Sequence, residues 1–125
     1  MPAVRGRNIL VIDDDRSIRE YLRYLLEDSG YGVQEAANGV EGIERFSTGE
    51  FDAVVTDISM PEKDGIDTII EMRASDPAVK IIAMSGVAKS DTLLEIAKMY
   101  RADLAIKKPF KSEDILSALR MVLGE

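Results

Sequence analysis

The sequence predicts an α/β fold in which a five-stranded parallel sheet is covered on both faces by five helices. Short, continuous apolar runs such as residues 8–13 are rich in β-branched side chains, which is typical of strands buried on both faces. Between these runs, apolar residues recur at helical spacing. Strands that alternate with helices form right-handed crossovers, so the expected architecture is a doubly wound α/β domain.

The first half of the chain contains three expected strands with two helices between them. The first helix ends at Gly30, a residue that commonly terminates helices. The second begins after Asn38, whose side-chain oxygen can cap the helix, and the side chain of Glu41, three residues later, can accept a hydrogen bond in return. This helix runs to about Thr48. The three strands are expected over residues 8–13, 31–36 and 51–57.

The second half adds three helices and two strands. The third helix follows a loop that contains Pro61 and Gly65, and Pro77 marks its end. Ser112 is expected to cap the last helix. The remaining strands are expected over residues 79–84 and 103–107. The apolar stripes that predict the three helices are Ile66, Ile69 and Ile70, then Leu93, Ile96, Ala97 and Tyr100, and finally Ile115, Leu119, Val122 and Leu123.

Length and composition limit what the chain can do. Its 125 residues suit one domain over residues 1–125, with a core over about 7–124. A net charge of −7 argues against nucleic-acid binding by this domain. Without Cys or His, thiolate and Ser-His-Asp catalysis are excluded, and a metal would need oxygen ligands, as Mg²⁺, Mn²⁺ and Ca²⁺ do. No run has the length of a signal peptide or membrane span, so we expect a cytoplasmic protein without membrane contact.

Polar side chains gather where the expected strands end. In doubly wound folds the ligand crevice lies beyond the carboxyl ends of the strands, so residues at these ends share one site. Each of them also fits a plain role on its own, as a helix cap, a turn residue or a solvated lysine. The residues at the strand ends are Asp13, Asp14, Asp15, Asp57, Ser85, Lys107 and Lys108.

Taken together, these side chains predict phosphoryl chemistry. Two carboxylates about 5 Å apart repel by roughly 3 kcal/mol at an effective dielectric near 20, so three in one crevice are unfavourable unless protons or a cation offset their charge. Mg²⁺ prefers a few carboxylates, waters and a phosphate oxygen. The ion leaves Asp57 ionised, and ionised carboxylates of this kind form aspartyl phosphates. A lysine and a hydroxyl can stabilise the charge that develops on the transferred group.

The chain resembles the receiver domains of two-component response regulators over essentially its whole length. The matching pieces are Ile-Leu-Val-Ile-Asp13-Asp14, Val-Val-Thr-Asp57-Ile-Ser-Met-Pro61 with Gly65, Ala-Met-Ser85-Gly, and Lys108-Pro109-Phe110. The resemblance implies a flavodoxin-like fold with strand order 2-1-3-4-5. It also implies a phosphorelay switch that catalyses only its own phosphorylation and dephosphorylation and otherwise acts by changing partner binding.

The same resemblance assigns a role to each site residue. Asp57 would be the phosphoacceptor, and the metal, Mg²⁺ or Mn²⁺, would be bound by Asp14, by Asp57 and by the backbone carbonyl of Ser59. Asp13 would complete the acidic pocket, contacting the metal through water. Lys108 would contact the phosphate or the free carboxylate; it is preferred over its neighbour because it directly precedes the proline, and that bond is usually cis in the family.

The switch residues match the family less fully. Ser85 would be the switch hydroxyl, and Asp15 is a spare acid that is expected to cap a helix. Most receivers carry a Tyr or Phe three residues before the lysine, but here that position is Ala105. The chemistry at Asp57 does not need the ring, whereas transmission to a partner can depend on it.

Three other functions compete with this interpretation. A Mg²⁺-dependent phosphatase with an Asp nucleophile commonly has a second Asp two residues later, where this chain has Ser59. A nucleotide-binding module would need a glycine-rich phosphate loop, and neither Gly-x-Gly-x-x-Gly nor the P-loop pattern occurs. A degenerate receiver that binds partners without phosphate is the third, and the complete set of acids, hydroxyl and lysine argues against it.

The lack of histidine also predicts the partner. The phosphoryl group must come from another protein's phosphohistidine or from a small acyl phosphate, so the expected partner is a histidine kinase or a histidine phosphotransfer protein. The resemblance also allows a phosphorylation-dependent homodimer through helix four, strand five and helix five. The sequence leaves open the cognate kinase, the output partner, and whether the domain stands alone or belongs to a longer regulator.

Overall fold

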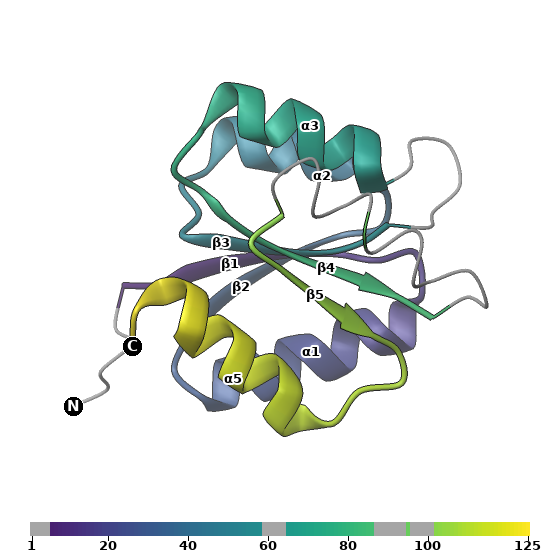
Figure 1. Cartoon of the computed structure of the whole chain (residues 1–125), viewed down its shortest axis with the longest axis vertical. Helices are drawn as coiled ribbons and strands as arrows, with labels where there is room; N and C mark the ends of the chain where they lie inside the picture. The colour runs from purple at the N-terminus through teal and green to yellow at the C-terminus, as the bar shows by residue number, and fades with distance from the viewer. Residues whose placement is uncertain (1–5, 59–64, 87–94, 96–101) are drawn as a thin grey trace.

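The computed structural model describes residues 6–58, 65–86, 95 and 102–125. Its centre is one sheet in which every neighbouring pair of strands is parallel, in the order β2-β1-β3-β4-β5 (Figure 1). This arrangement confirms the expected fold and strand order. The strands are β1 (Asn8–Ile12), β2 (Gly32–Ala36), β3 (Ala53–Asp57), β4 (Lys80–Ser85) and β5 (Leu104–Lys107).

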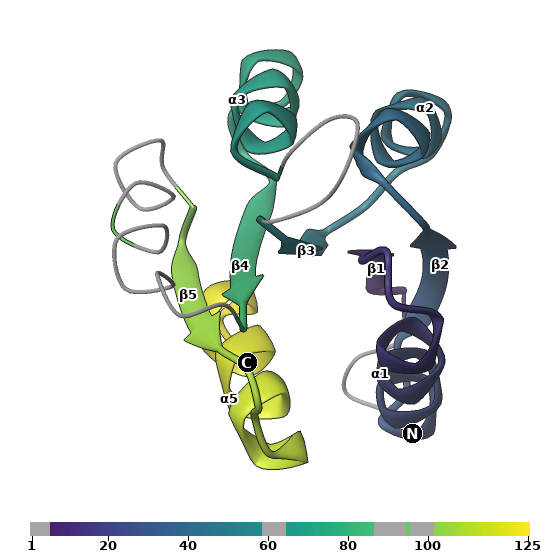
Figure 2. The same ribbon diagram turned by 90° about the vertical axis from the view of Figure 1, so that its right-hand side faces the viewer.

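Helices cover both faces of the sheet. Figures 1 and 2 show α1 and α5 on one face and α2 and α3 on the other. The expected fourth helix, with Leu93, Ile96, Ala97 and Tyr100, lies outside the described residues. None of the helices in the described part of the chain combines the length and apolar character needed to span a bilayer. The described helices are α1 (Arg16–Asp28), α2 (Gly39–Thr48), α3 (Gly65–Ser75) and α5 (Ser112–Leu123).

Two apolar cores, one on each face of the sheet, explain the continuous apolar strands. In β1, Ile9 and Val11 belong to the core under α1 and α5, whereas Leu10 and Ile12 belong to the core under α2 and α3. All four side chains are fully buried. Successive side chains of a strand point to opposite faces, so a strand between two helical layers is mostly apolar on both faces.

The first two helices begin with the caps that the sequence predicts. Asp15 caps α1, and its Oδ1 accepts hydrogen bonds from the amides of Ser17 at 2.9 Å and Ile18 at 3.4 Å. Asn38 caps α2, and its Oδ1 accepts from the Glu41 amide at 2.8 Å. The Glu41 carboxylate turns back to the amide of Ala37, one residue before the cap, at 2.7 Å.

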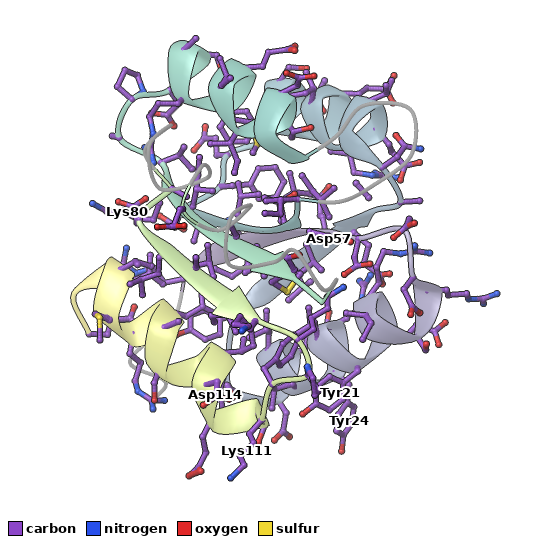
Figure 3. All side chains as sticks on the ribbon, turned by 45° about the vertical axis from the view of Figure 1, so that its right-hand side comes forward. Tyr21, Tyr24, Asp57, Lys80, Lys111 and Asp114 are labelled. Atoms are coloured by element: carbon purple, nitrogen blue, oxygen red, sulfur yellow. The ribbon has the colours of Figure 1, made fainter. Side chains whose placement is uncertain are left out.

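The expected cap of the last helix is wrong. Ser112 is the first residue of α5, and Lys111 occupies the N-cap position. The Asp114 carboxylate accepts a hydrogen bond from the Lys111 amide at 2.8 Å, and Figure 3 shows both residues at the beginning of this helix. A carboxylate is a stronger acceptor than a hydroxyl and is stabilised by the positive end of the helix, so Asp114 organises this terminus.

Candidate functional site

The carboxyl ends of four adjacent strands bring the predicted site residues together. Asp13 follows β1, Asp57 ends β3, Ser85 ends β4 and Lys108 follows β5. Figure 3 shows Asp57 at this edge and Lys80, the first residue of β4, at the opposite edge. Because the strands are parallel and adjacent, residues as far apart in the sequence as Asp13 and Lys108 meet at one edge of the sheet.

Three carboxylates form an acidic cluster that is suited to a metal ion. Asp13, Asp14 and Asp57 each place one carboxylate oxygen within 4.8 Å of the others. Asp13 is fully buried and Asp57 is 5% exposed, whereas Asp14 is exposed to solvent. Hard divalent cations prefer such all-oxygen donor sets, so the side chains fit Mg²⁺ or Mn²⁺.

Lys108 lies between two of these acids. Its Nζ donates a hydrogen bond to Asp13 Oδ2 at 2.7 Å and lies 3.7 Å from Asp57 Oδ2. Its amide donates to the carbonyl of Ser85 at 2.8 Å, which ties β4 to the residue that follows β5. The peptide bond from Lys108 to Pro109 is cis, as the resemblance implies. Of the two neighbouring lysines, Lys108 is therefore the one with its ammonium in the site.

The pKa values of Asp13 and Lys108 are both raised, for different reasons. Burial raises the pKa of Asp13 above its usual value, and the hydrogen bonds from Lys108 and from the Asp15 amide offset this only in part. Burial by itself would lower the pKa of Lys108, but the hydrogen bond to Asp13 and the charges of the three acids raise it. Three carboxylates around one ammonium leave an excess of negative charge, which a divalent cation would neutralise.

Ser85 places a hydroxyl group at the same edge. The residue is fully buried, and within the described part of the structure its Oγ has no hydrogen-bond partner. A buried, unsatisfied hydroxyl is costly in a folded protein and often has a functional explanation. The next residue, Gly86, permits the close approach of Lys108, because a Cβ at Gly86 would lie only 3.0 Å from the Lys108 Cβ.

Of two further predicted positions, Ser59 and Ala105, the structure describes only Ala105. Ser59, the expected source of a backbone carbonyl ligand, lies outside the described residues. Ala105 lies in β5 opposite Ala83 of β4, is partly buried and packs against the core under α2 and α3. At this position of β5 a methyl group therefore stands where most receivers have an aromatic ring.

One residue at the site was missed by sequence reasoning. The Arg19 guanidinium donates a hydrogen bond from Nη1 to the main-chain carbonyl of Asp13 at 2.9 Å. Arg19 is in the second turn of α1, where an arginine usually indicates an exposed face. The only signal in the sequence was its position five residues after the acidic pair.

Comparison of the sequence and the fold with known proteins identifies a family. Residues 9–120 match the response regulator receiver domain family. Chemotaxis protein CheY of Thermotoga maritima is 36% identical over 118 residues, which cover 94% of this chain and 98% of the relative. A response regulator receiver domain protein from Clostridium thermocellum superimposes with a TM-score of 0.88 at 29% identity, covering 94% of each chain.

A third relative was solved with ligands. The response regulator protein TrrA from Thermotoga maritima, in complex with Mg(2+)-BeF, has a TM-score of 0.85 and is 30% identical, with 94% of this chain and 99% of that chain covered. The fold, the acidic edge of the sheet and these sequence matches all lead to one family. The chain belongs to the response regulator receiver domains.

Proposed function

We propose that this receiver domain accepts a phosphoryl group on Asp57 while Asp13, Asp14 and Asp57 hold a Mg²⁺ ion. The observation that carries the proposal is the meeting of these three carboxylates within 4.8 Å at the end of the sheet, with the Lys108 ammonium 3.7 Å from Asp57 Oδ2. The likeness to TrrA, solved in complex with Mg(2+)-BeF, supports the same ion here.

Each side chain has a part in metal binding or in phosphoryl transfer. Asp14 and Asp57 are direct ligands, Asp13 acts through a water molecule, and the backbone carbonyl of Ser59 completes the protein ligands. When bound, the ion neutralises negative charge so that an anionic phosphoryl group can approach a carboxylate. Mn²⁺ satisfies the same oxygen donors.

The transfer itself is a displacement at phosphorus. An oxygen of the Asp57 carboxylate forms a bond to phosphorus as the bond from phosphorus to the donor's imidazole nitrogen breaks, and that nitrogen keeps the electron pair. Lys108 stabilises the negative charge on the phosphoryl oxygens. Ser85 donates its hydroxyl, which has no partner among the described residues, to one of these oxygens.

The phosphoryl donor is a second protein. Receiver domains are signalling switches and not classical enzymes. The chain has no histidine, so its protein donor is a histidine kinase or a histidine phosphotransfer protein, and a small acyl phosphate is a second source of the group. We propose a single domain over residues 1–125 that works in the cytoplasm, without binding membranes or nucleic acid, and changes its affinity for an output partner. A phosphorylation-dependent homodimer through the fourth helix, β5 and α5 is one such output.

Intact-mass spectrometry tests the proposal directly. With Mg²⁺ and acetyl phosphate, the wild-type chain should gain the mass of one phosphoryl group, and Asp57→Asn should gain none. Asp52→Asn is the matched control, because Asp52 precedes the same strand at the opposite edge of the sheet and should leave the gain intact. A phosphoryl group on Asp57→Asn would show that another residue is the acceptor.

A further inference from the structure

Asp13 is restrained at each of its polar atoms. Its amide donates to the carbonyl of Ala36 at 3.1 Å. Its Oδ1 accepts from the Asp15 amide at 2.9 Å, and its Oδ2 accepts from Lys108 Nζ at 2.7 Å. Its main-chain carbonyl accepts from Arg19 Nη1 at 2.9 Å. The last of these contacts is the only one that acts on the peptide unit leading into Asp14.

Arg19 is itself held in place from β2. Its Nε donates to Glu35 Oε1 at 3.2 Å, and the other oxygen of Glu35 accepts from Arg23 Nη1 at 2.9 Å. The Arg19 side chain is 16% exposed, which is low for an arginine and limits the directions it can take. Burial by itself would raise the pKa of Glu35, but the hydrogen bonds from Arg23 and Arg19 outweigh it and lower the pKa. Glu35 therefore stays ionised and orients Arg19.

We infer that Arg19 is a positioning residue for metal binding, because its hydrogen bond to the Asp13 carbonyl sets the direction of the peptide that carries Asp14. The inference rests on the metal site proposed above. The peptide unit is planar, so the carbonyl of Asp13 and the amide of Asp14 turn together. Asp14 is exposed, and its carboxylate reaches the cluster only if this peptide points the right way. Outer contacts of this kind tune metal affinity in other proteins.

The direction in which substitution of Arg19 changes the affinity for Mg²⁺ separates a positioning role from two simpler roles. Loss of the guanidinium removes a positive charge near the site, and by charge alone this would raise the affinity for Mg²⁺. A role confined to folding would lower the melting temperature and leave the affinity of the folded protein unchanged. Positioning predicts a fall in affinity, against the effect of the lost charge.

Titration calorimetry with Mg²⁺ on the folded variants measures this affinity. We expect Arg19→Ala to lower the affinity about tenfold, the lower end of what outer contacts to metal ligands contribute. Arg16→Ala is the matched control, since it removes the same charge from the first turn of α1 at a side chain that is 81% exposed and paired with Glu20. This control should bind Mg²⁺ at least as tightly as the wild type.

Arg19→Met keeps the aliphatic volume of the side chain and should show the same fall if Arg19→Ala does not fold. Thermal unfolding in a chelator shows which variants are folded. An affinity equal to or above that of the wild type in the folded Arg19 variant would overturn the inference while leaving the proposed function intact. A wild-type chain that binds no Mg²⁺ would overturn both. If Mg²⁺ binds as expected and Asp57 gains no phosphoryl group, only the proposed function fails.

Discussion

Asp13, Asp14 and Asp15 are three identical side chains in a row, and the fold gives each a different environment. Asp13 is buried against Lys108, and Asp14 is exposed at the rim of the acidic cluster. Asp15 caps α1, and the hydrogen bond from the Ser17 hydroxyl lowers its pKa. The end of β1 and the start of α1 turn these three neighbours in different directions, so one is buried against Lys108, one is exposed at the acidic cluster and one caps a helix.

This division predicts different effects of neighbouring substitutions. Asp14→Ala should lower Mg²⁺ affinity roughly tenfold or more, because a direct ligand contributes at least as much as an outer contact. Calorimetry or amide NMR can measure the affinity, since the chain has no Trp to report by fluorescence. Asp15→Asn is the control: it removes one charge but keeps an N-cap oxygen, and it should change the affinity little. Undiminished affinity in Asp14→Ala would contradict the proposed ligand.

Among the elements, β5 carries the departure from the family pattern at Ala105. It is a short edge strand, paired only with β4, and none of its residues is fully buried. Ala105, at the position of the family's aromatic residue, places a methyl group against the core. A phosphoryl group shifts a conformational equilibrium only through its different interactions with the two states. Without a ring to relocate, β5 has little to contribute to that difference.

We therefore expect phosphorylation to act mainly before and at the start of the fourth helix, and little in β5. This region, residues 87–94, lies outside the described residues. Amide shifts on adding beryllofluoride and Mg²⁺ should be large there and small over Ala102 to Lys107 and on the outer face of α5. Ala105→Phe is the informative variant, because a ring should bring large shifts back to β5.

Large shifts over Ala102 to Lys107 in the wild-type chain would contradict this prediction. They would mean that another side chain replaces the missing ring, and Tyr100 is the candidate. Tyr100→Ala would then abolish those shifts.

At the scale of the whole molecule, Glu125 joins segments that are distant in sequence. It follows α5, and its carboxylate pairs with Arg7 Nε at 3.0 Å, just before β1. The same carboxylate accepts a hydrogen bond from the Tyr31 hydroxyl at 3.1 Å, at the entry to β2. Burial, together with the Glu125 charge and this hydrogen bond, raises the pKa of Tyr31 to about 12. The contacts connect α5 to two strands at the amino edge of the sheet.

The Tyr31 pKa predicts how stability changes in base. Above pH 10.0 the unfolded chain loses the phenol proton while the folded chain keeps it until about pH 12. The neutral phenol therefore stabilises the fold below pH 10.0, and this contribution is lost as the pH rises toward 12. One pKa unit corresponds to about 1.4 kcal/mol, so after screening we expect a loss of roughly 1–2 kcal/mol.

Urea unfolding across the alkaline range measures this loss. Tyr31→Phe removes the ionisable group, so its stability should fall less steeply with pH than that of the wild type, while the lysines contribute equally to both. Parallel pH profiles for the two proteins would show that the Tyr31 pKa is not raised.

Much of the fold followed from local sequence patterns. The sequence placed all five strands to within two residues at either end. The pattern was clearest in β1, where every residue after Asn8 is apolar because helices cover both faces of the sheet. The caps Asp15 and Asn38 were predictable, since a cap bonds to amides two or three residues away. The expected cap at Ser112 was wrong because the helix begins at Ser112 itself, after Lys111, whose amide donates to the Asp114 carboxylate.

The sequence by itself determined which polar residues share an edge, because parallel strands bring their carboxyl ends to the same side and each strand ends near an identifiable residue. Only the tertiary structure decided how these residues pair. Lys108 bonds to Asp13 at 2.7 Å and stays 3.7 Å from Asp57, and Arg19 reaches the Asp13 carbonyl with Glu35 behind it. Such contacts join side chains of different elements, and their directions depend on how helices pack on the sheet, a property that no local pattern contains.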